Sequence, residues 1–227
     1  MVQSSNIKNK LQVLIKVGLI VMWFYMIDIL LVSTISLFFD EQTLYRKYIM
    51  NHQYLLSFIS RTICFFGLVI TTNKNRVITW ANEKEVNLYK IIYYIVCGLL
   101  GWLLGTVIVN ILLPMFPEYK EINTLFEGNE HVFRFIVIVI IAPFIEEYVF
   151  RGKIQGYLKQ EFGIIIAIIL QAIIFAGLHG LVLQQIYAFI LGVYMGYIKN
   201  KEDNFMSTLI IHMIINGIGW YIGTLNV

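Results

Sequence analysis

The chain has 227 residues, of which 59% are hydrophobic and only 14% are charged, whereas soluble domains contain about 25% charged residues. The excess of 17 Lys and Arg over 14 Asp and Glu leaves a net charge of +3, too small to keep so apolar a surface in solution. Together with a mean hydropathy of +0.74, these values exclude most soluble folds and indicate an integral membrane protein.

Seven apolar stretches follow one another along the chain, each about long enough to cross a hydrocarbon core of about 30 Å as a helix. They cover residues 11–39, 54–72, 91–113, 131–158, 162–179, 182–198 and 205–224. The stretches are continuous rather than alternating, which favours helices over the strands of a membrane barrel. We therefore expect an all-α, polytopic membrane bundle of about seven transmembrane helices. Cys64 and Cys97 lie inside these stretches and are expected to be buried core residues rather than a disulfide or a metal pair.

Basic residues are distributed unequally between the segments that connect the spans. One set of segments contains 11 Lys and Arg and the alternate set contains 3. The larger set comprises Lys8, Lys10, Lys74, Arg76, Lys84, Lys90, Arg151, Lys153, Lys159, Lys199 and Lys201. Because such residues favour the cytoplasmic side, we expect the N-terminus to be cytoplasmic. Lys16, Arg61 and Arg134 remain inside spans or at their edges.

The chain reads as a single membrane domain over residues 1–227, because it has no internal repeat and no Gly/Ser-rich linker. Residues 1–130 supply the first transmembrane helices and carry no recognisable motif. Residues 131–224 concentrate carboxylates, an arginine and two histidines in apolar sequence. An ionisable residue at membrane depth is costly and is by default a candidate functional residue.

Three groups of polar residues stand out in the second part. Glu147 and Arg151 are four residues apart, so on a helix they share a face and can form an ion pair with a structural role. Glu146 points away from that face and is free to act on another group. His179 comes shortly after the small residues Ala176 and Gly177, and His212 and Asn216 lie one turn apart on a later helix.

A depth estimate indicates that these groups can meet. At 1.5 Å per helical residue, Glu146, His179, His212 and Asn216 lie roughly 12–27 Å from the turns on the predicted cytoplasmic side. Allowing for helix tilt of about 20°, all four side chains fall in one band of the membrane. We therefore expect one cavity lined by all four.

These residues resemble the motifs of the CPBP family, the CAAX-protease and bacteriocin-processing intramembrane proteases also called the Abi family. The family's motifs are E-E-x-x-x-R, F-x-x-x-H and H-x-x-x-N or H-x-x-x-D. They match here, in the family's order, at Glu146-Glu147…Arg151, Phe175…His179 and His212…Asn216. The resemblance covers roughly residues 131–224.

The resemblance implies an intramembrane endopeptidase in which Glu146 activates water and His179 positions or polarises it. His212 and Asn216 would stabilise the oxyanion, while Glu147 and Arg151 would hold the site together. Family members have often been described as metalloproteases, and two Glu and two His could ligate zinc. The chain has no H-E-x-x-H pair, and an amide suits hydrogen bonding better than zinc binding, so we favour a mechanism without a metal and keep zinc as the alternative.

The expected substrate is a small peptide or a membrane-associated protein, met in the lipid bilayer, and no nucleic-acid partner is expected. Short loops favour a bacterial plasma membrane over an endoplasmic reticulum. Two other functions compete with proteolysis. The polar cluster could serve partner binding without catalysis, for example in bacteriocin self-immunity, or it could line a transport path. The three intact motifs favour the enzyme, and the lack of a repeat disfavours the transporter.

Overall fold

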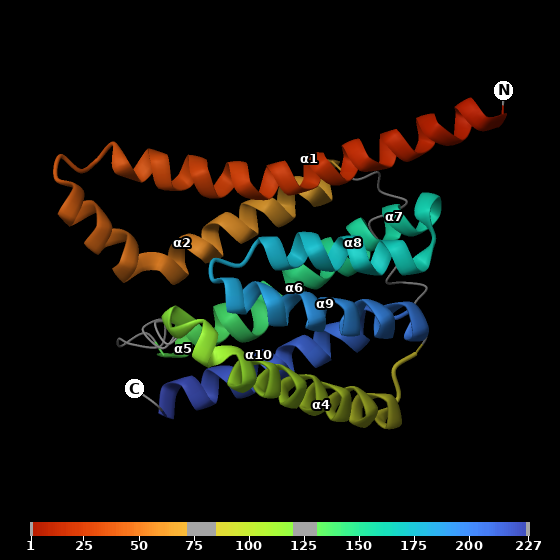
Figure 1. The fold of residues 1–227 in the computed structure, drawn as a ribbon. Coiled ribbons are helices and arrows are strands. Elements are labelled where there is room, and N and C mark those ends of the chain that lie inside the picture. The colour runs from red at the N-terminus through yellow and green to blue at the C-terminus, as the bar shows by residue number, and fades with distance from the viewer. Residues whose placement is uncertain (1, 72–84, 120–130, 226–227) are drawn as a thin grey trace.

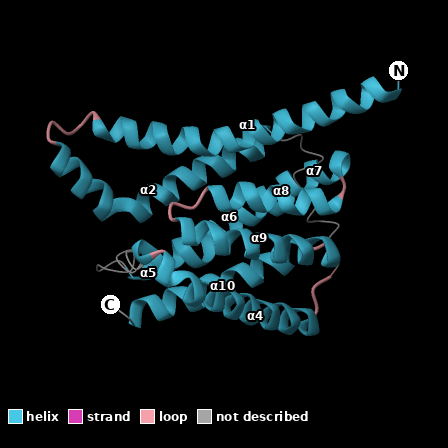
Figure 2. Ribbon diagram, in the orientation of Figure 1, coloured by secondary structure: helices cyan, strands magenta, loops and turns pink. Residues whose placement is uncertain are grey.

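The computed structural model describes residues 2–71, 85–119 and 131–225, and all regular structure within these ranges is helical (Figures 1 and 2). The expected all-α bundle is therefore confirmed. Cys64 and Cys97 are both buried and unbridged. The basic residues Lys74, Arg76 and Lys84 lie outside the described residues.

The helices follow the predicted stretches, except that α1 and α2 begin 9 and 12 residues before the predicted starts at residues 11 and 54. The first three long helices are α1 (Val2–Ser36), α2 (Gln42–Thr71, kinked at His52) and α4 (Leu88–Leu112), which runs into the short helix η2 (Leu113–Met115). A composite helix follows, made of α5 (His131–Phe135), η4 (Ile136–Ile141), α6 (Ala142–Glu146), η5 (Glu147–Ile154) and α7 (Gln155–Phe162). The chain ends with α8 (Ile164–Gly177), α9 (Val182–Glu202) and α10 (Phe205–Leu225).

The predicted number of seven spans is not confirmed. Among the described residues, four helical stretches are both long and apolar enough to cross a membrane. They are Ile7–Ser36, Asn51–Ile70, Leu88–Met115 and Phe205–Leu225. Helix α8 is apolar but has only 14 residues. The composite helix is not among these four stretches. It carries polar residues, Glu147, Arg151 and Gln155, which are buried in the interior of the bundle.

One end of the bundle gathers the segments that the basic residues mark as cytoplasmic. The start of α1, the start of α4, the α7–α8 turn and the α9–α10 turn lie at the same end of the molecule (Figure 1). This arrangement is the one that the unequal distribution of Lys and Arg requires. The compartment that this end faces stays a prediction.

A glycine face on α4 lets this helix approach α10 and α9 closely. Gly98, Gly101 and Gly105 are buried and spaced by three and four residues, so they share one side of α4. A Cβ atom at Gly98 would lie 2.7 Å from Cβ of Ile214, and one at Gly101 would lie 2.9 Å from Cδ1 of Ile215. The close approach seats α10, which carries His212 and Asn216.

Glutamine side chains attach α9 to the helices before it. Gln171 of α8 is fully buried, and its amide donates to the carbonyl of Gly192 at 2.8 Å. Gln155 of α7 donates to the carbonyl of Gly196 at 2.9 Å. Because neither glycine has a side chain, the amides can reach the α9 backbone directly. These bonds fix the helices on both sides of the turn that carries His179.

The N-terminal helices share a core with the motif-bearing segment. Buried Val13, Val17 and Phe24 of α1 and Cys64 and Leu68 of α2 belong to the same cluster as Phe150 and Phe175. The rings of Phe24 and Phe150 lie 6.2 Å apart. Helices α1 and α2 therefore pack onto the segment that carries the candidate site instead of forming a separate unit.

We expect the substitution Gly98→Ala to destabilise the protein, because the added methyl group meets the β-branched carbon of Ile214 and not the end of a flexible side chain. Overpacking of this kind costs about 1–3 kcal/mol. Thermal unfolding in detergent measures the effect. Gly18→Ala is the matched control, since nothing lies within 4 Å of its added carbon, and alanine is favoured over glycine in a helix by about 1 kcal/mol. Equal stability of the two variants would contradict the proposed packing.

Candidate active site

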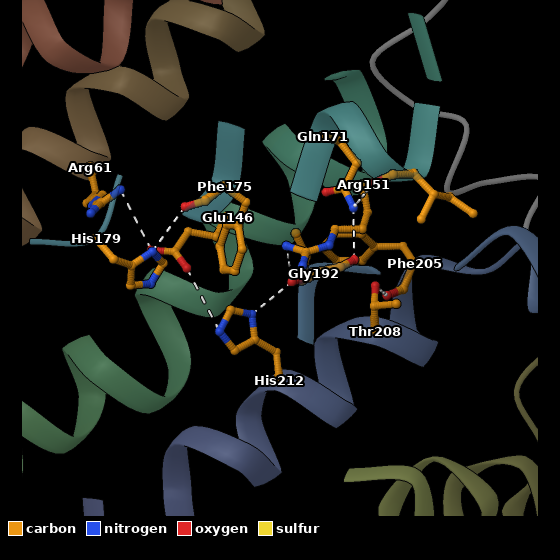
Figure 3. A network of polar contacts seen from close by, with 12 residues as sticks. Arg61, Glu146, Arg151, Gln171, Phe175, His179, Gly192, Phe205, Thr208 and His212 are labelled. Atoms are coloured by element: carbon orange, nitrogen blue, oxygen red, sulfur yellow. Dashed lines mark hydrogen bonds and ion pairs between the residues drawn. The ribbon is translucent and has the colours of Figure 1, made fainter. Parts of the chain in front are cut away.

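The structure brings the four predicted catalytic residues to one cavity. Glu146 ends α6, His179 lies in the turn after α8, and His212 and Asn216 lie on α10. All four line a cavity of about 480 Å³ between α4, α9, α10 and the composite helix. Figure 3 shows Glu146 between His179 and His212. The depth estimate from the sequence therefore agrees with the observed convergence.

The Glu146 carboxylate contacts a cation on one side and a histidine on the other. Its Oε1 lies 3.7 Å from Nη1 of Arg61, and its Oε2 lies 3.9 Å from Nε2 of His212 (Figure 3). Its side chain is 13% exposed, toward the cavity. Glu146 thus has no partner in its own helix, as the spacing predicts, but it has partners from α2 and α10.

Glu147 and Arg151 form an ion pair that is fully buried. Nη1 of Arg151 lies 3.0 Å from Oε1 of Glu147, and neither side chain is exposed. The same Glu147 oxygen lies 2.8 Å from Nδ1 of His212. A carboxylate paired with arginine can only accept, so Nδ1 of His212 carries the proton. Nε2 is then the ring atom that faces Glu146 and the cavity.

His179 is oriented by the backbone around it. Its Nδ1 lies 3.0 Å from the carbonyl oxygen of Phe175. Because a carbonyl can only accept, Nδ1 donates and Nε2 of the neutral ring is left as an acceptor. The Gln185 side chain donates to the carbonyl of His179 at 2.7 Å and fixes the turn. His179 therefore presents a proton acceptor beside Glu146.

Phe175 is a site residue whose role the sequence analysis missed. Its ring lies 5.0 Å from that of His179 and 6.1 Å from that of His212, edge to face in both pairs. The Arg151 guanidinium carbon lies 4.3 Å from its centroid on the other side. An aromatic residue in an apolar helix is usually a core residue. Only the position of Phe175 in the F-x-x-x-H motif could have indicated its role at the site.

A proline upstream of the glutamates explains how Asn216 is oriented. Residues Ile136–Ile141 form a π-helical turn, in which each carbonyl accepts from the amide five residues later. For Ile138 that residue is Pro143, which has no N–H. The Asn216 amide donates to the Ile138 carbonyl instead, at 3.0 Å. One N–H of Asn216 is thereby fixed and the second remains for a ligand.

Arg61 is the second site residue that the sequence analysis did not assign. It lies on α2, within a long apolar stretch, and reaches the site through its contact with Glu146. Its guanidinium carbon also lies 5.6 Å from the centroid of the Phe24 ring. The available signal was its position, because an ionisable side chain at membrane depth is a candidate functional residue.

The donors at the site do not have the arrangement of a metal centre. Within the described residues, no group of three or more His, Cys, Asp or Glu side chains is placed to hold a metal ion. Nδ1 of His179 and Nδ1 of His212 are both engaged in hydrogen bonds to other groups, which leaves Nε2 of each ring as the atom that could bind a metal. A zinc site needs three or four ligands that converge on one point. The mechanism without a metal stays a prediction, with zinc as the alternative.

Comparison with known proteins connects this geometry to one family. Residues 128–218 match the family model described as Rce1-like, type II CAAX prenyl endopeptidase. Neither the comparison with curated proteins nor that with solved structures returns a match. The matched segment contains all three motifs and all four residues around the cavity. Residues 128–218 are therefore similar to the Rce1-like, type II CAAX prenyl endopeptidase family, as the resemblance of the motifs indicates.

Proposed function

We propose that the protein is an intramembrane endopeptidase that hydrolyses a peptide bond with water activated by Glu146. The observation that carries the proposal is the convergence of Glu146, His179, His212 and Asn216 on one cavity from three separate helical segments. Peptide hydrolysis needs an activated water and fixed donors for the developing oxyanion, and both act best where bulk water is excluded. No Ser or Cys lies among the motif residues, so water is the favoured nucleophile.

Two acceptors are available to hold and activate the water. Glu146 and His179 both line the cavity, and the carboxylate of Glu146 and Nε2 of His179 are the acceptors that they offer. Water bound between them would transfer a proton to Glu146 as its oxygen attacks the carbonyl carbon. Glu146 would then return that proton to the leaving amine. His179 acts here as the group that positions the water.

Two donors on α10 would receive the oxyanion. The free N–H of Asn216 is one, and Nε2 of His212 is the other when this nitrogen is protonated. Both residues lie one turn apart on the same face of α10, so their side chains can converge on one oxygen. The bonds to Ile138 and Glu147 keep each donor from rotating, which is the preorganisation that oxyanion stabilisation requires.

The cavity of about 480 Å³ fits an apolar peptide segment. Its wall includes Trp102, Trp220, Tyr187, Leu191 and Met195 beside the polar site residues. Aromatic and aliphatic walls with a few converging polar groups are typical of sites for apolar ligands. We therefore propose a small peptide or a membrane-associated protein as substrate, cleaved in a bacterial plasma membrane.

The two adjacent glutamates should respond differently to the same substitution. Glu146→Gln is nearly isosteric and should keep the fold while abolishing proteolysis, because an amide cannot accept the proton of the attacking water. Glu147→Gln should lower stability by about 3–5 kcal/mol, because it leaves the Arg151 charge buried without its partner. Thermal unfolding of the purified variants, and peptide profiles of cells that carry each of them, measure the two effects. Full cleavage by Glu146→Gln would end its assignment as the base.

Asn216→Ala should slow hydrolysis, and it should also lower stability by about 1–3 kcal/mol, because the Ile138 carbonyl loses its donor. Loss of one oxyanion donor elsewhere lowers the rate by about 10²–10³, and we expect a decrease on that scale with an unchanged substrate affinity. Asn216→Asp should recover little activity, since an ionised carboxylate repels the oxyanion. Single-turnover rates on a cleaved peptide separate the rate from the affinity. A variant that loses affinity at full rate would contradict the role.

Chelation provides the test of the metal-free mechanism. Activity should survive phenanthroline, because the proposed steps use only the side chains of Glu146, His179, His212 and Asn216. Loss of activity with phenanthroline, followed by recovery with stoichiometric zinc, would make Glu146 and the two histidines ligands. That result would replace the mechanism and leave the location of the site unchanged.

A further inference from the structure

The cavity of about 480 Å³ extends from the candidate site toward one end of the bundle. On α10 its wall runs from His212 to Gly223, roughly 16 Å at 1.5 Å per residue. On α4 it runs from Trp102 to Asn110, in the last turn of that helix. On α9 it begins at Gln184, in the first turn. All three helices therefore contribute residues up to the end of the bundle that lies opposite the basic segments (Figure 1).

The bundle is tightly packed between the candidate site and its basic end. On α10 the residues next to the site in that direction include Ile211 and Thr208, which have no exposed surface. On the composite helix, Phe150, Ile154 and Leu158 recur every four residues and are at most 1% exposed. None of these five residues lines the cavity. Within the described residues, packed side chains therefore separate the site from the basic end.

Polar and aromatic residues mark the far end of the cavity as the level of the water interface. Asn110 lines the cavity, is exposed and lies two residues before the end of α4. Tyr119 also lines the cavity and follows exposed Glu118. Exposed polar groups are costly in hydrocarbon, and Tyr and Trp are enriched where a membrane meets water. The cavity therefore reaches water at this end.

The charges at the two ends of the bundle indicate which compartment each end faces. The segments rich in Lys and Arg favour the cytoplasm. At the opposite end, the exposed charged side chains among the described residues are Asp40, Glu41 and Glu118 together with Arg46 and Lys47. This end has no excess of basic residues within that part of the chain. The cavity thus reaches water on the side that the charge distribution assigns to the exterior.

We propose that the active site is open to the outer face of the membrane and closed to the cytoplasm, so that its substrate is an exported peptide or a segment anchored at the outer face. This inference rests on the proposed function, because it names the side from which the same site receives its substrate. A translocation step must then precede hydrolysis. A peptide in the cytoplasm would have to pass the packed layer that contains Phe150, Ile154 and Ile211.

The accessibility of engineered cysteines in intact cells tests this inference without turnover. Gly219 lines the cavity three residues after Asn216, and nothing lies within 4 Å of a carbon added to it. Gly219→Cys therefore places a thiol in the cavity. Gln160→Cys is the matched control, because Gln160 is exposed in the last turn of α7, at the basic end.

The reagent is a membrane-impermeant, positively charged methanethiosulfonate, which reacts with the ionised thiol and therefore with a cysteine in water. Thiols that remain free are then labelled with a maleimide in detergent and counted. Wild-type protein gives the background, because Cys64 and Cys97 are 1% and 6% exposed and neither lines the cavity.

We expect Gly219→Cys to lose its free thiol in intact cells and Gln160→Cys to lose it only after the membrane is permeabilised. Reaction of Gln160→Cys in intact cells would overturn the orientation. A Gly219→Cys protein that reacts only after permeabilisation, or under neither condition, would overturn the outward opening. Asn110→Cys, at the exposed far end of the cavity, keeps the test readable if Gly219→Cys does not fold, and its failure to react in intact cells would also overturn the inference.

Blocking the cavity from outside connects this route to the proposed reaction. Treatment of intact cells that carry Gly219→Cys should change their peptide profile as Glu146→Gln does, whereas treated wild-type cells should keep theirs. An unchanged profile in fully modified cells would overturn the route. Failure of the proposed function has a different signature, which is a profile that Glu146→Gln leaves unchanged while Gly219→Cys still reacts from outside.

Discussion

The buried ion pair between Glu147 and Arg151 is the interaction on which the rest of the site depends. Neither charge is exposed, and a single buried charge costs several kcal/mol, so each side chain requires the other. The Glu147 oxygen that meets Arg151 also fixes the proton on Nδ1 of His212. Arg151 lies against Phe175, whose ring contacts both histidines. One pair therefore holds three helical segments in register around Glu146.

The composite helix gains its site geometry from departures from the ordinary α-helix. Residues 136–141 and 147–154 form π-helical turns, which rotate the residues after them relative to an unbroken α-helix. Pro143 lies between the two turns and leaves the Ile138 carbonyl without its backbone donor. At membrane depth such a carbonyl needs a partner. Asn216 donates to it. One hydrogen bond therefore both satisfies the backbone carbonyl and orients the amide that we propose as catalytic.

Prediction from the sequence succeeded where the membrane or the motifs restrict the chain. Apolar stretches predicted the helices, except for the more polar starts of α1 and α2, and depth along the helices predicted that Glu146 and His212 meet. The number of spans was not confirmed. The helices that line the site carry polar residues that contact one another inside the bundle, and such residues lower the hydropathy by which a span is recognised. The contact between Arg61 and Glu146 could not be predicted, since no local spacing relates two residues so distant in the chain. The spacing of Gly98 and Gly101 predicts a close packing face but not the helix that fills it.

The N-terminal helices contribute chemistry as well as packing. The family match begins at residue 128, yet the cation nearest to Glu146 comes from α2. Phe24 of α1 packs on Phe150 and also lies beneath the Arg61 guanidinium, so the position of that cation depends on both helices. The environment of Glu146 therefore includes a charge from outside the matched segment. Substitutions in α1 and α2 can therefore change the position of the cation beside Glu146 while the three motifs remain intact.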